Sequence, residues 1–181
     1  ECRIWELRLG TACGRIVLNQ GVGNINEFKS LFRQRLIDCT WQKWADHIRT
    51  SSRFDMYRNF CCVPSLKPYL LLDMDQHLKY ITTKFRLGIS DLKVHHFRYK
   101  TFQSNDLLCP LCKETEENEL HFVLYCPALR NICEHFIRPK YHTQPSMFKL
   151  ILLMSSTSPE TVRNLSLFLY NAFKFREIAI S

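Results

Sequence analysis

Cys109-Pro-Leu-Cys112, followed by His121 and Cys126, is the stretch around which this chain is organised. Three cysteines and one histidine in the pattern Cys-x2-Cys-x8-His-x4-Cys form a complete tetrahedral ligand set for zinc. Four protein ligands leave no open position for water, so the pattern favours one structural zinc ion over a catalytic one. The x4 spacing places His121 about one helical turn before Cys126, and Pro127 marks a break after it. The alternative is that the four residues are unrelated, in a chain with nine cysteines.

The remaining cysteines are interpreted as packing residues with free thiols, which are commonly buried. They are Cys2, Cys13, Cys39, Cys61, Cys62 and Cys133. An odd cysteine count without a secretory signal favours a reducing compartment and bound metal over disulfides. Cys133 and His135 lie close enough to Cys126 in sequence to replace one of the four ligands, and this alternative stays open.

Composition indicates a folded chain. The 181 residues suffice for one medium or two small domains, and 46% hydrophobic with 13% aromatic residues is typical of globular proteins. A start at Glu1 is expected of a piece of a longer protein. The longest apolar run, Met147 to Met154, contains Lys149 and is far shorter than the roughly 20 residues of a membrane span. We expect an intracellular protein, nuclear or cytoplasmic, without a membrane partner.

Hydrophobic periodicity predicts a mainly α fold, with several short helices around a small Cys-Cys-His-Cys zinc knuckle. Four segments are expected: a loop-rich N-terminal segment (1–23), a helical basic region (24–104), the knuckle with its following helix (105–138), and C-terminal helices on the same domain (139–181). Within the second segment, Asn24 to Ile48 is predicted to be a helix with an apolar stripe in the core, stopped near Thr50 to Ser52.

Further helices are expected from Leu71 to Phe85 with a stop at Gly88, over Ile89 to Tyr99, after Pro127, and from Ser158-Pro159-Glu160 onward. Asp73 and Asp75 are interpreted as acids favoured by the dipole at a helix start rather than as a cation-binding pair.

The charge pattern predicts a partner. The formal net charge is +8, and six Lys or Arg against one acid lie between Lys79 and Lys100, interleaved with aromatic residues. Cations for phosphates and rings for stacking are the ingredients of RNA or DNA contact. The predicted nucleic-acid-binding residues are Lys84, Arg86, Lys93, Arg98 and Lys100; the alternative is a solvated basic helix face. Inside the knuckle loop, four acids would instead repel phosphate: Glu114, Glu116, Glu117 and Glu119.

Several of these residues belong to a familiar pattern. Lys84-Phe-Arg-Leu-Gly-Ile-Ser, Leu107-Leu-Cys-Pro-Leu-Cys-Lys, Glu116-Glu-Asn-Glu-Leu-His-Phe-Val-Leu-Tyr-Cys-Pro and Leu129-Arg130 together resemble the reverse-transcriptase zinc-binding region, which lies near the C-terminus of non-LTR retrotransposon polyproteins. The resemblance covers roughly residues 30–138. Asn118 stands where the family pattern has an acid three residues before the histidine.

The resemblance implies a piece of a mobile-element protein that engages template RNA or target DNA, with the remainder of the polyprotein as a further partner. It implies no catalysis by this chain, because the family's polymerase needs adjacent aspartates and no Asp-Asp occurs here. We therefore predict a zinc-stabilised nucleic-acid-binding tail without catalytic residues. The alternative is a domesticated or decayed fragment that binds protein through the acidic loop at Glu116 and Glu117, with purely structural zinc.

Overall fold

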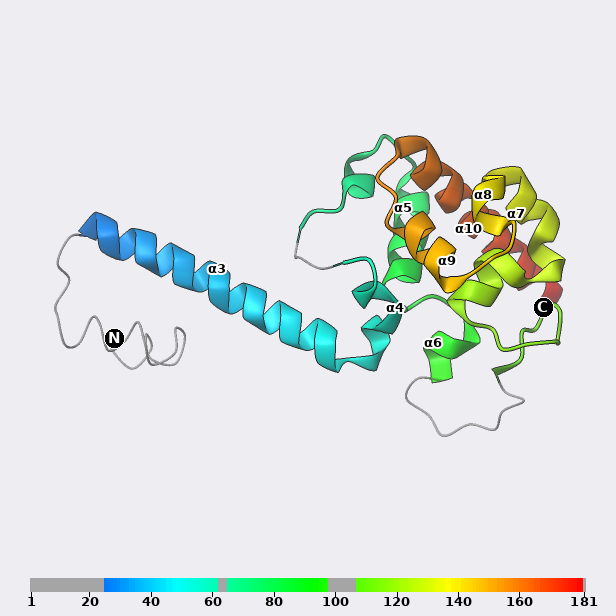
Figure 1. Ribbon diagram of the computed structural model, residues 1–181, viewed down its shortest axis with the longest axis horizontal. Helices are drawn as coiled ribbons and strands as arrows, with labels where there is room; N and C mark the ends of the chain where they lie inside the picture. Colours follow the sequence, from blue (N-terminus) through cyan, green and yellow to red (C-terminus); the bar gives the residue numbers. More distant parts are fainter. Residues whose placement is uncertain (1–24, 62–64, 98–106, 181) are drawn as a thin grey trace. The chain divides into compact units, whose positions relative to one another are not determined.

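The computed structural model describes residues 25–61, 65–97 and 107–180 and divides the chain into two compact units, 1–50 and 51–181 (Figure 1). The predicted loop-rich segment 1–23 lies outside the described residues. The predicted helical region 24–104 spans the boundary between the units, whereas 105–138 and 139–181 share the second unit.

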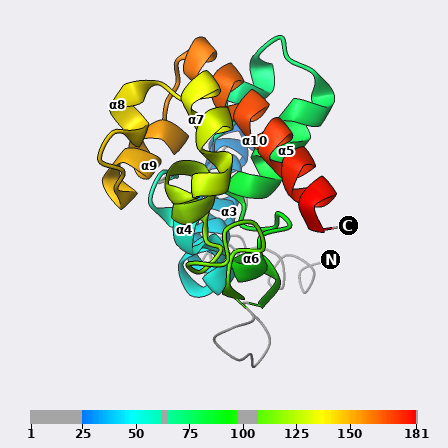
Figure 2. The same cartoon turned by 90° about the vertical axis from the view of Figure 1, so that its right-hand side faces the viewer.

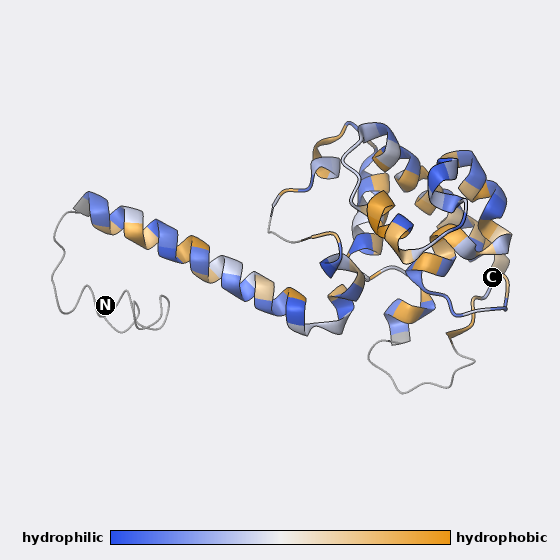
Figure 3. Cartoon of the chain, in the orientation of Figure 1, coloured by the Kyte–Doolittle hydropathy of each residue, from blue (hydrophilic) through white to orange (hydrophobic). Residues whose placement is uncertain are grey.

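The described part of the first unit is one 26-residue helix, α3 (Ile25–Thr50), which ends where the sequence predicted. The expected apolar stripe is buried at Ile48, which is 7% exposed, but not along most of its length: Leu31, Leu36 and Trp41 are 61%, 42% and 47% exposed. These side chains are five residues apart, so each is turned about 140° from the one before it. Their apolar surface is therefore spread around the helix, and Figure 3 shows polar and apolar residues mixed along it.

The second unit is built from helices, and the prediction of a mainly α fold is confirmed. In chain order they are η1 (Ser52–Phe54), α4 (Asp55–Arg58), η2 (Pro68–Leu71), α5 (Gln76–Arg86), α6 (Lys93–Phe97), η4 (His121–Tyr125), η5 (Pro127–Leu129), α7 (Arg130–Phe136), α8 (Pro139–His142), α9 (Met147–Met154) and α10 (Pro159–Ile180). An isolated antiparallel bridge joins Leu108 to Glu116.

Local signals explain where α5 begins and ends. The Asp75 carboxylate caps the helix by accepting a hydrogen bond from the His77 N–H at 2.7 Å, so the helix starts later than the predicted Leu71. Asp75 is thus an acid of a helix start, as interpreted from the sequence. Gly88, at φ 66°, takes the left-handed conformation that follows many helices, and the chain turns away there as predicted.

The core of the second unit lies around α10, which begins at Pro159 as predicted and lies beside α5 (Figure 2). Phe122, from the predicted knuckle, is fully buried at the centre of this core. Its ring centroid lies 4.7 Å from that of Phe173 and 6.3 Å from that of Phe85. Burying a phenylalanine of this kind contributes about 1.5–3 kcal/mol, so the knuckle is a structural part of the helical core.

Across the described ranges, none of the helices combines the length and the apolar character that crossing a membrane would require.

Candidate metal centre

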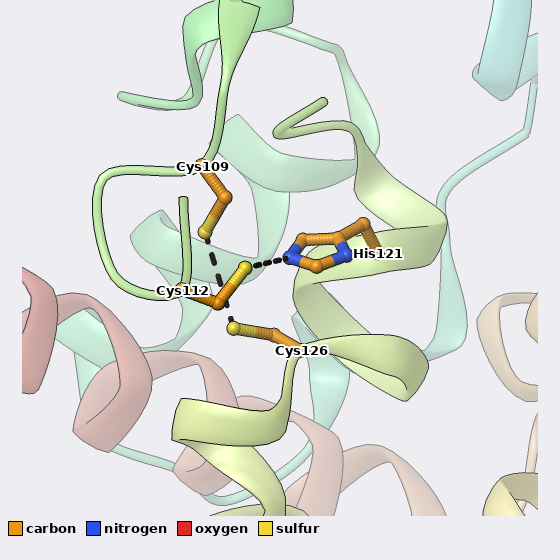
Figure 4. A group of neighbouring side chains, drawn as sticks. All are labelled: Cys109, Cys112, His121 and Cys126. Atoms are coloured by element: carbon orange, nitrogen blue, oxygen red, sulfur yellow. Dashed lines mark hydrogen bonds between the residues drawn. The ribbon is translucent and has the colours of Figure 1, made fainter. Parts of the chain in front are cut away.

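The structure brings together the four predicted ligands, Cys109, Cys112, His121 and Cys126, whose ligand atoms all lie within 4.8 Å of one another (Figure 4). The Sγ atoms of Cys109 and Cys126 are 3.9 Å apart, and Cys112 Sγ lies 3.4 Å from His121 Nε2. A tetrahedral zinc ion with ordinary bond lengths requires S···S and S···N separations of about 3.8 and 3.6 Å. The cluster therefore has the dimensions of a four-ligand metal site.

A tight loop presents the first two cysteines. The Cys109 N–H donates to the Thr115 carbonyl and the Lys113 N–H donates to the Cys109 carbonyl, both at 2.8 Å. Lys113 has a φ of 60°, in the left-handed region that a non-glycine residue rarely adopts. This reversal after Cys112 brings both thiols to the same side of the loop.

A π-helical turn, η4, presents the other two ligands. The Cys126 N–H donates to the His121 carbonyl at 2.7 Å, a bond between residues five apart in sequence. In an α-helix such residues are rotated by about 140° from each other, whereas a π turn is wider and brings them closer to one face. The predicted single turn between the two ligands is present, and its π form is what suits the x4 spacing.

The orientation of His121 is set by a residue that sequence reasoning missed. The Thr115 hydroxyl lies 2.7 Å from His121 Nδ1. When Nδ1–H donates to this oxygen, the lone pair of Nε2 faces the thiols, as a metal ligand requires. Asn118, where the family pattern has an acid, accepts a hydrogen bond from the His121 N–H at 2.9 Å. The sequence signal that could have identified Thr115 as a hydrogen-bond partner of His121 was its hydroxyl, in the loop between Cys112 and His121.

Cys109 and Cys126 share a proton when no metal is bound. The hydrogen bond with Cys126 holds the pKa of Cys109 well below its usual range, and the same bond raises the pKa of Cys126. The hydrogen bond therefore favours a form in which one sulfur is a thiolate that accepts from the other. A metal ion bound by both sulfurs would displace the remaining proton, because the thiolate is the ligand form of cysteine.

Neither alternative ligand joins the cluster. Cys133 is buried in α7, where burial raises the pKa of its thiol to about 11 and so favours the protonated, non-ligating form. His135 is exposed on the same helix, with its ring edge-on to that of Phe136 at 4.6 Å. The described residues thus place the predicted four at the site, and neither Cys133 nor His135 among them.

Two of the four knuckle acids are internal. Glu117 is fully buried and binds the guanidinium of Arg176 in α10 through both carboxylate oxygens, at 2.6 and 2.8 Å. It also accepts the Lys93 N–H at 2.8 Å. Glu119 is paired with buried His95 at 2.9 Å. The expectation that Glu117 belongs to an exposed recognition loop is wrong, because its charge is neutralised inside the protein.

The predicted basic surface is only partly present. Arg86 is buried; its guanidinium lies 4.5 Å from the centroid of the Tyr69 ring and donates to the Met154 carbonyl. Its assignment as a nucleic-acid-binding residue is therefore wrong, because an internal guanidinium cannot reach a phosphate. Lys84 stays partly exposed, with its Nζ 3.6 Å from the Asp91 carboxylate.

The three other predicted basic residues have different placements. Lys93 is partly exposed at the first position of α6. Arg98 and Lys100 lie outside the described residues. Of the five predicted side chains, the structure therefore places Lys84 and Lys93 where solvent reaches them.

Comparisons with known proteins found no match: no protein-family model, no curated protein and no solved structure is significantly similar to this chain. The family suggested by the sequence motifs stays a prediction. The functional argument rests on the geometry of the four ligands and on the charges and rings at the surface of the second unit.

Proposed function

We propose that this chain is a zinc-stabilised nucleic-acid-binding module from the C-terminal part of a non-LTR retrotransposon polyprotein, without polymerase or nuclease activity of its own. The observation that carries the proposal is the Cys109, Cys112, His121 and Cys126 cluster, in which the four motif residues meet at metal-ligand distances. The motif that resembles the retroelement region is thus the part of the sequence that forms a site.

The donor set supports zinc as the metal. Thiolates and a neutral imidazole in a tetrahedral arrangement suit zinc far better than calcium or magnesium, which take oxygen ligands. Cys109 and Cys126 are buried, and four protein ligands leave no place for a reacting water. A structural role follows, in which the ion holds the loop with Cys109 against the turn with His121.

The charges support a polyanionic partner. The chain carries a formal net charge of +8. The negative charge of Glu117 is compensated inside by Arg176, and the buried Glu119 carboxylate is hydrogen-bonded to His95, so both acids oppose an approaching phosphate less than exposed acids would. Lys84 remains at the surface on α5, as part of the predicted basic segment.

The test joins metal content to salt-dependent binding. Protein purified without chelators is expected to hold about one equivalent of zinc by elemental analysis. Single-stranded RNA and DNA oligonucleotides are expected to bind more weakly at about 200 mM than at about 50 mM salt, since phosphate contacts release counterions. Less than half an equivalent of zinc would contradict the metal, and salt-independent binding would contradict phosphate contacts.

A second candidate function is a protein-interaction module with purely structural zinc. The observation in its favour is the exposed apolar face of α9, where Phe148 and Leu152 are 72% and 46% exposed. An apolar face of this kind suits contact with another protein, such as the remainder of a polyprotein. A chain that holds zinc but binds neither RNA nor DNA at low salt would favour this function over the first.

A further inference from the structure

A groove of about 520 Å³ runs between α5 and the second half of α10, and none of the four metal ligands lines it. One face of each helix lines it: His77, Tyr80 and Lys84 from α5, at spacings of three and four, and Tyr170, Lys174 and Glu177 from α10, at spacings of four and three. These spacings put each trio on one side of its helix. The volume lies in the range of small-molecule and single-nucleotide sites.

Tyr80 and His77 present exposed rings at the groove, whereas Phe173, which also lines it, packs on Phe122 in the core. Tyr80 is 58% exposed, and its ring is stacked on that of His77, with centroids 6.4 Å apart. The Lys84 Nζ lies 5.5 Å from the centroid of the Tyr80 ring. The His77 ring meets that of Tyr170 edge to face, at 5.7 Å. Exposed rings of this kind offer a face on which a base can stack, and such stacking tolerates any base.

The groove carries charges of both signs. Lys84 and Lys174 supply ammonium groups, while Asp91 and Glu177 supply carboxylates, and Lys84 Nζ is paired with the Asp91 carboxylate at 3.6 Å. Arg176 also borders the groove, but its guanidinium is bound to Glu117. In a duplex the bases are stacked and paired, so none is free to stack on Tyr80 or to donate its pairing groups to a carboxylate.

A single nucleotide presents a different set of groups. Its phosphate suits an ammonium group, whereas the amino group of a base and a ribose 2′-hydroxyl are donors that a carboxylate accepts. The mixed charge of the groove therefore fits a nucleotide of single-stranded RNA better than a duplex or a DNA strand.

We infer that the α5–α10 groove binds single-stranded RNA, with a base stacked on Tyr80, the phosphates at Lys84 and Lys174, and the carboxylates of Asp91 and Glu177 accepting hydrogen bonds from the base or the 2′-hydroxyl. This inference rests on the proposed nucleic-acid-binding function. It names the surface and the kind of nucleic acid.

The experiment measures the affinity of the full chain for a fluorescently labelled, unstructured 12-nucleotide RNA across a salt series. Tyr80→Ala is expected to weaken binding about tenfold, because one stacked base is lost. Tyr80→Phe keeps the ring and is expected to bind like the unaltered protein. Lys174→Gln is expected to lower the salt slope by about 0.7, the value of one phosphate contact in a single strand.

Matched controls separate the groove from general effects. Lys140→Gln removes one exposed positive charge from α8, outside the groove, and is expected to leave the slope unchanged. Zinc content and circular dichroism check that each variant is folded. RNA with 5-iodouridine should crosslink to Tyr80 or Tyr170 on irradiation, with the modified peptide identified by mass spectrometry.

The outcomes distinguish the groove from the function. If the chain binds RNA and both Tyr80→Ala and Lys174→Gln bind as tightly as the unaltered protein, the groove assignment fails while the function stands. Equal affinity for the DNA oligonucleotide of the same sequence would overturn the assignment of RNA. Binding to neither RNA nor DNA would overturn both the nucleic-acid-binding function and the groove assignment. This conclusion would hold even if the chain bound another protein.

Discussion

At the scale of single residues, the 2.7 Å hydrogen bond between Thr115 and His121 bears on which ring nitrogen of the histidine can bind a metal. A free imidazole exchanges its proton between the two ring nitrogens, and one of the two tautomers offers Nε2 to a metal. The hydroxyl can accept a hydrogen bond from Nδ1–H, as that tautomer requires, and the contact holds the ring with Nε2 toward Cys112.

Thr115→Val should therefore weaken zinc binding while leaving the stoichiometry at one. Loss of such a supporting contact typically lowers metal affinity by about 10- to 100-fold. Competition with a chromophoric chelator measures the effect, and Thr115→Ser, which retains a hydroxyl, should bind zinc nearly as tightly as the unaltered protein. Equal affinity of the valine variant would contradict a role for Thr115 in orienting the ring.

The raised pKa of Cys133 indicates that this residue is not a metal ligand. Because burial raises this pKa to about 11, the thiol is protonated at neutral pH, below its pKa, and is a poor metal ligand. Cys133→Ala should keep one equivalent of zinc, while Cys112→Ser should lose it. Elemental analysis of both variants measures this, and loss of zinc from the alanine variant would place Cys133 in the site.

The sequence could predict the metal ligands because their spacing is local. It could not predict hydrogen-bond partners that are brought together only when the chain folds. Thr115 needs the closed loop to reach His121. Arg86 was grouped with its basic neighbours by charge alone, yet it lies four residues after buried Thr82 and so shares its side of α5. Its carbonyl partner, on Met154, is 68 positions away.

At the scale of elements, the Glu117 carboxylate joins three parts of the second unit. It accepts two hydrogen bonds from Arg176 of α10 and one from the first N–H of α6. The side chains of the ion pair are 0% and 10% exposed. The carboxylate thus fixes the knuckle loop to the helix that carries the core.

Glu117→Gln should destabilise the fold by about 3–5 kcal/mol, because it leaves the buried Arg176 guanidinium without a counter-charge. Urea unfolding followed by circular dichroism measures the change. Glu116→Gln is the matched control: Glu116 is exposed, so its substitution is expected to change stability by no more than about 0.5 kcal/mol. Similar effects of the two substitutions would show that the buried ion pair contributes little.

Helix starts with capping or proline signals, such as those of α5 and α10, were partly or fully predictable, because such signals act within a few residues. The π form of η4 was not, since the sequence between His121 and Cys126 carries no local signal that distinguishes a π turn from an α turn. The burial expected along α3 is found at Ile48 but not at Leu31, Leu36 or Trp41. Apolar residues at roughly helical spacing do not always share one face of the helix. Leu31, Leu36 and Trp41, which follow one another at steps of five residues, point in different directions.

At the scale of the whole molecule, the metal centre and the helices share one core within residues 51–181. Cys109, Cys126 and Phe122 belong to the same buried cluster as Phe85 of α5 and Phe168 of α10. The segments 107–138 and 139–180 therefore contribute side chains to one core, together with Phe85 from the region expected at 24–104. A pattern of ligands marks where a metal binds, whereas the extent of a core depends on contacts distant in sequence.

Removing the metal should consequently loosen more than the knuckle. Zinc at about 1,000 times its dissociation constant stabilises the folded state by about 4 kcal/mol, and this free energy is lost when a chelator is added. Because Phe122 packs on Phe85 and Phe173, amides of α5 and α10 should exchange hydrogen faster, along with those of 107–138. Hydrogen exchange with mass spectrometry measures this, with α3 of the first unit as the internal control. Faster exchange confined to 107–138 would contradict a shared core and would favour a knuckle that folds by itself.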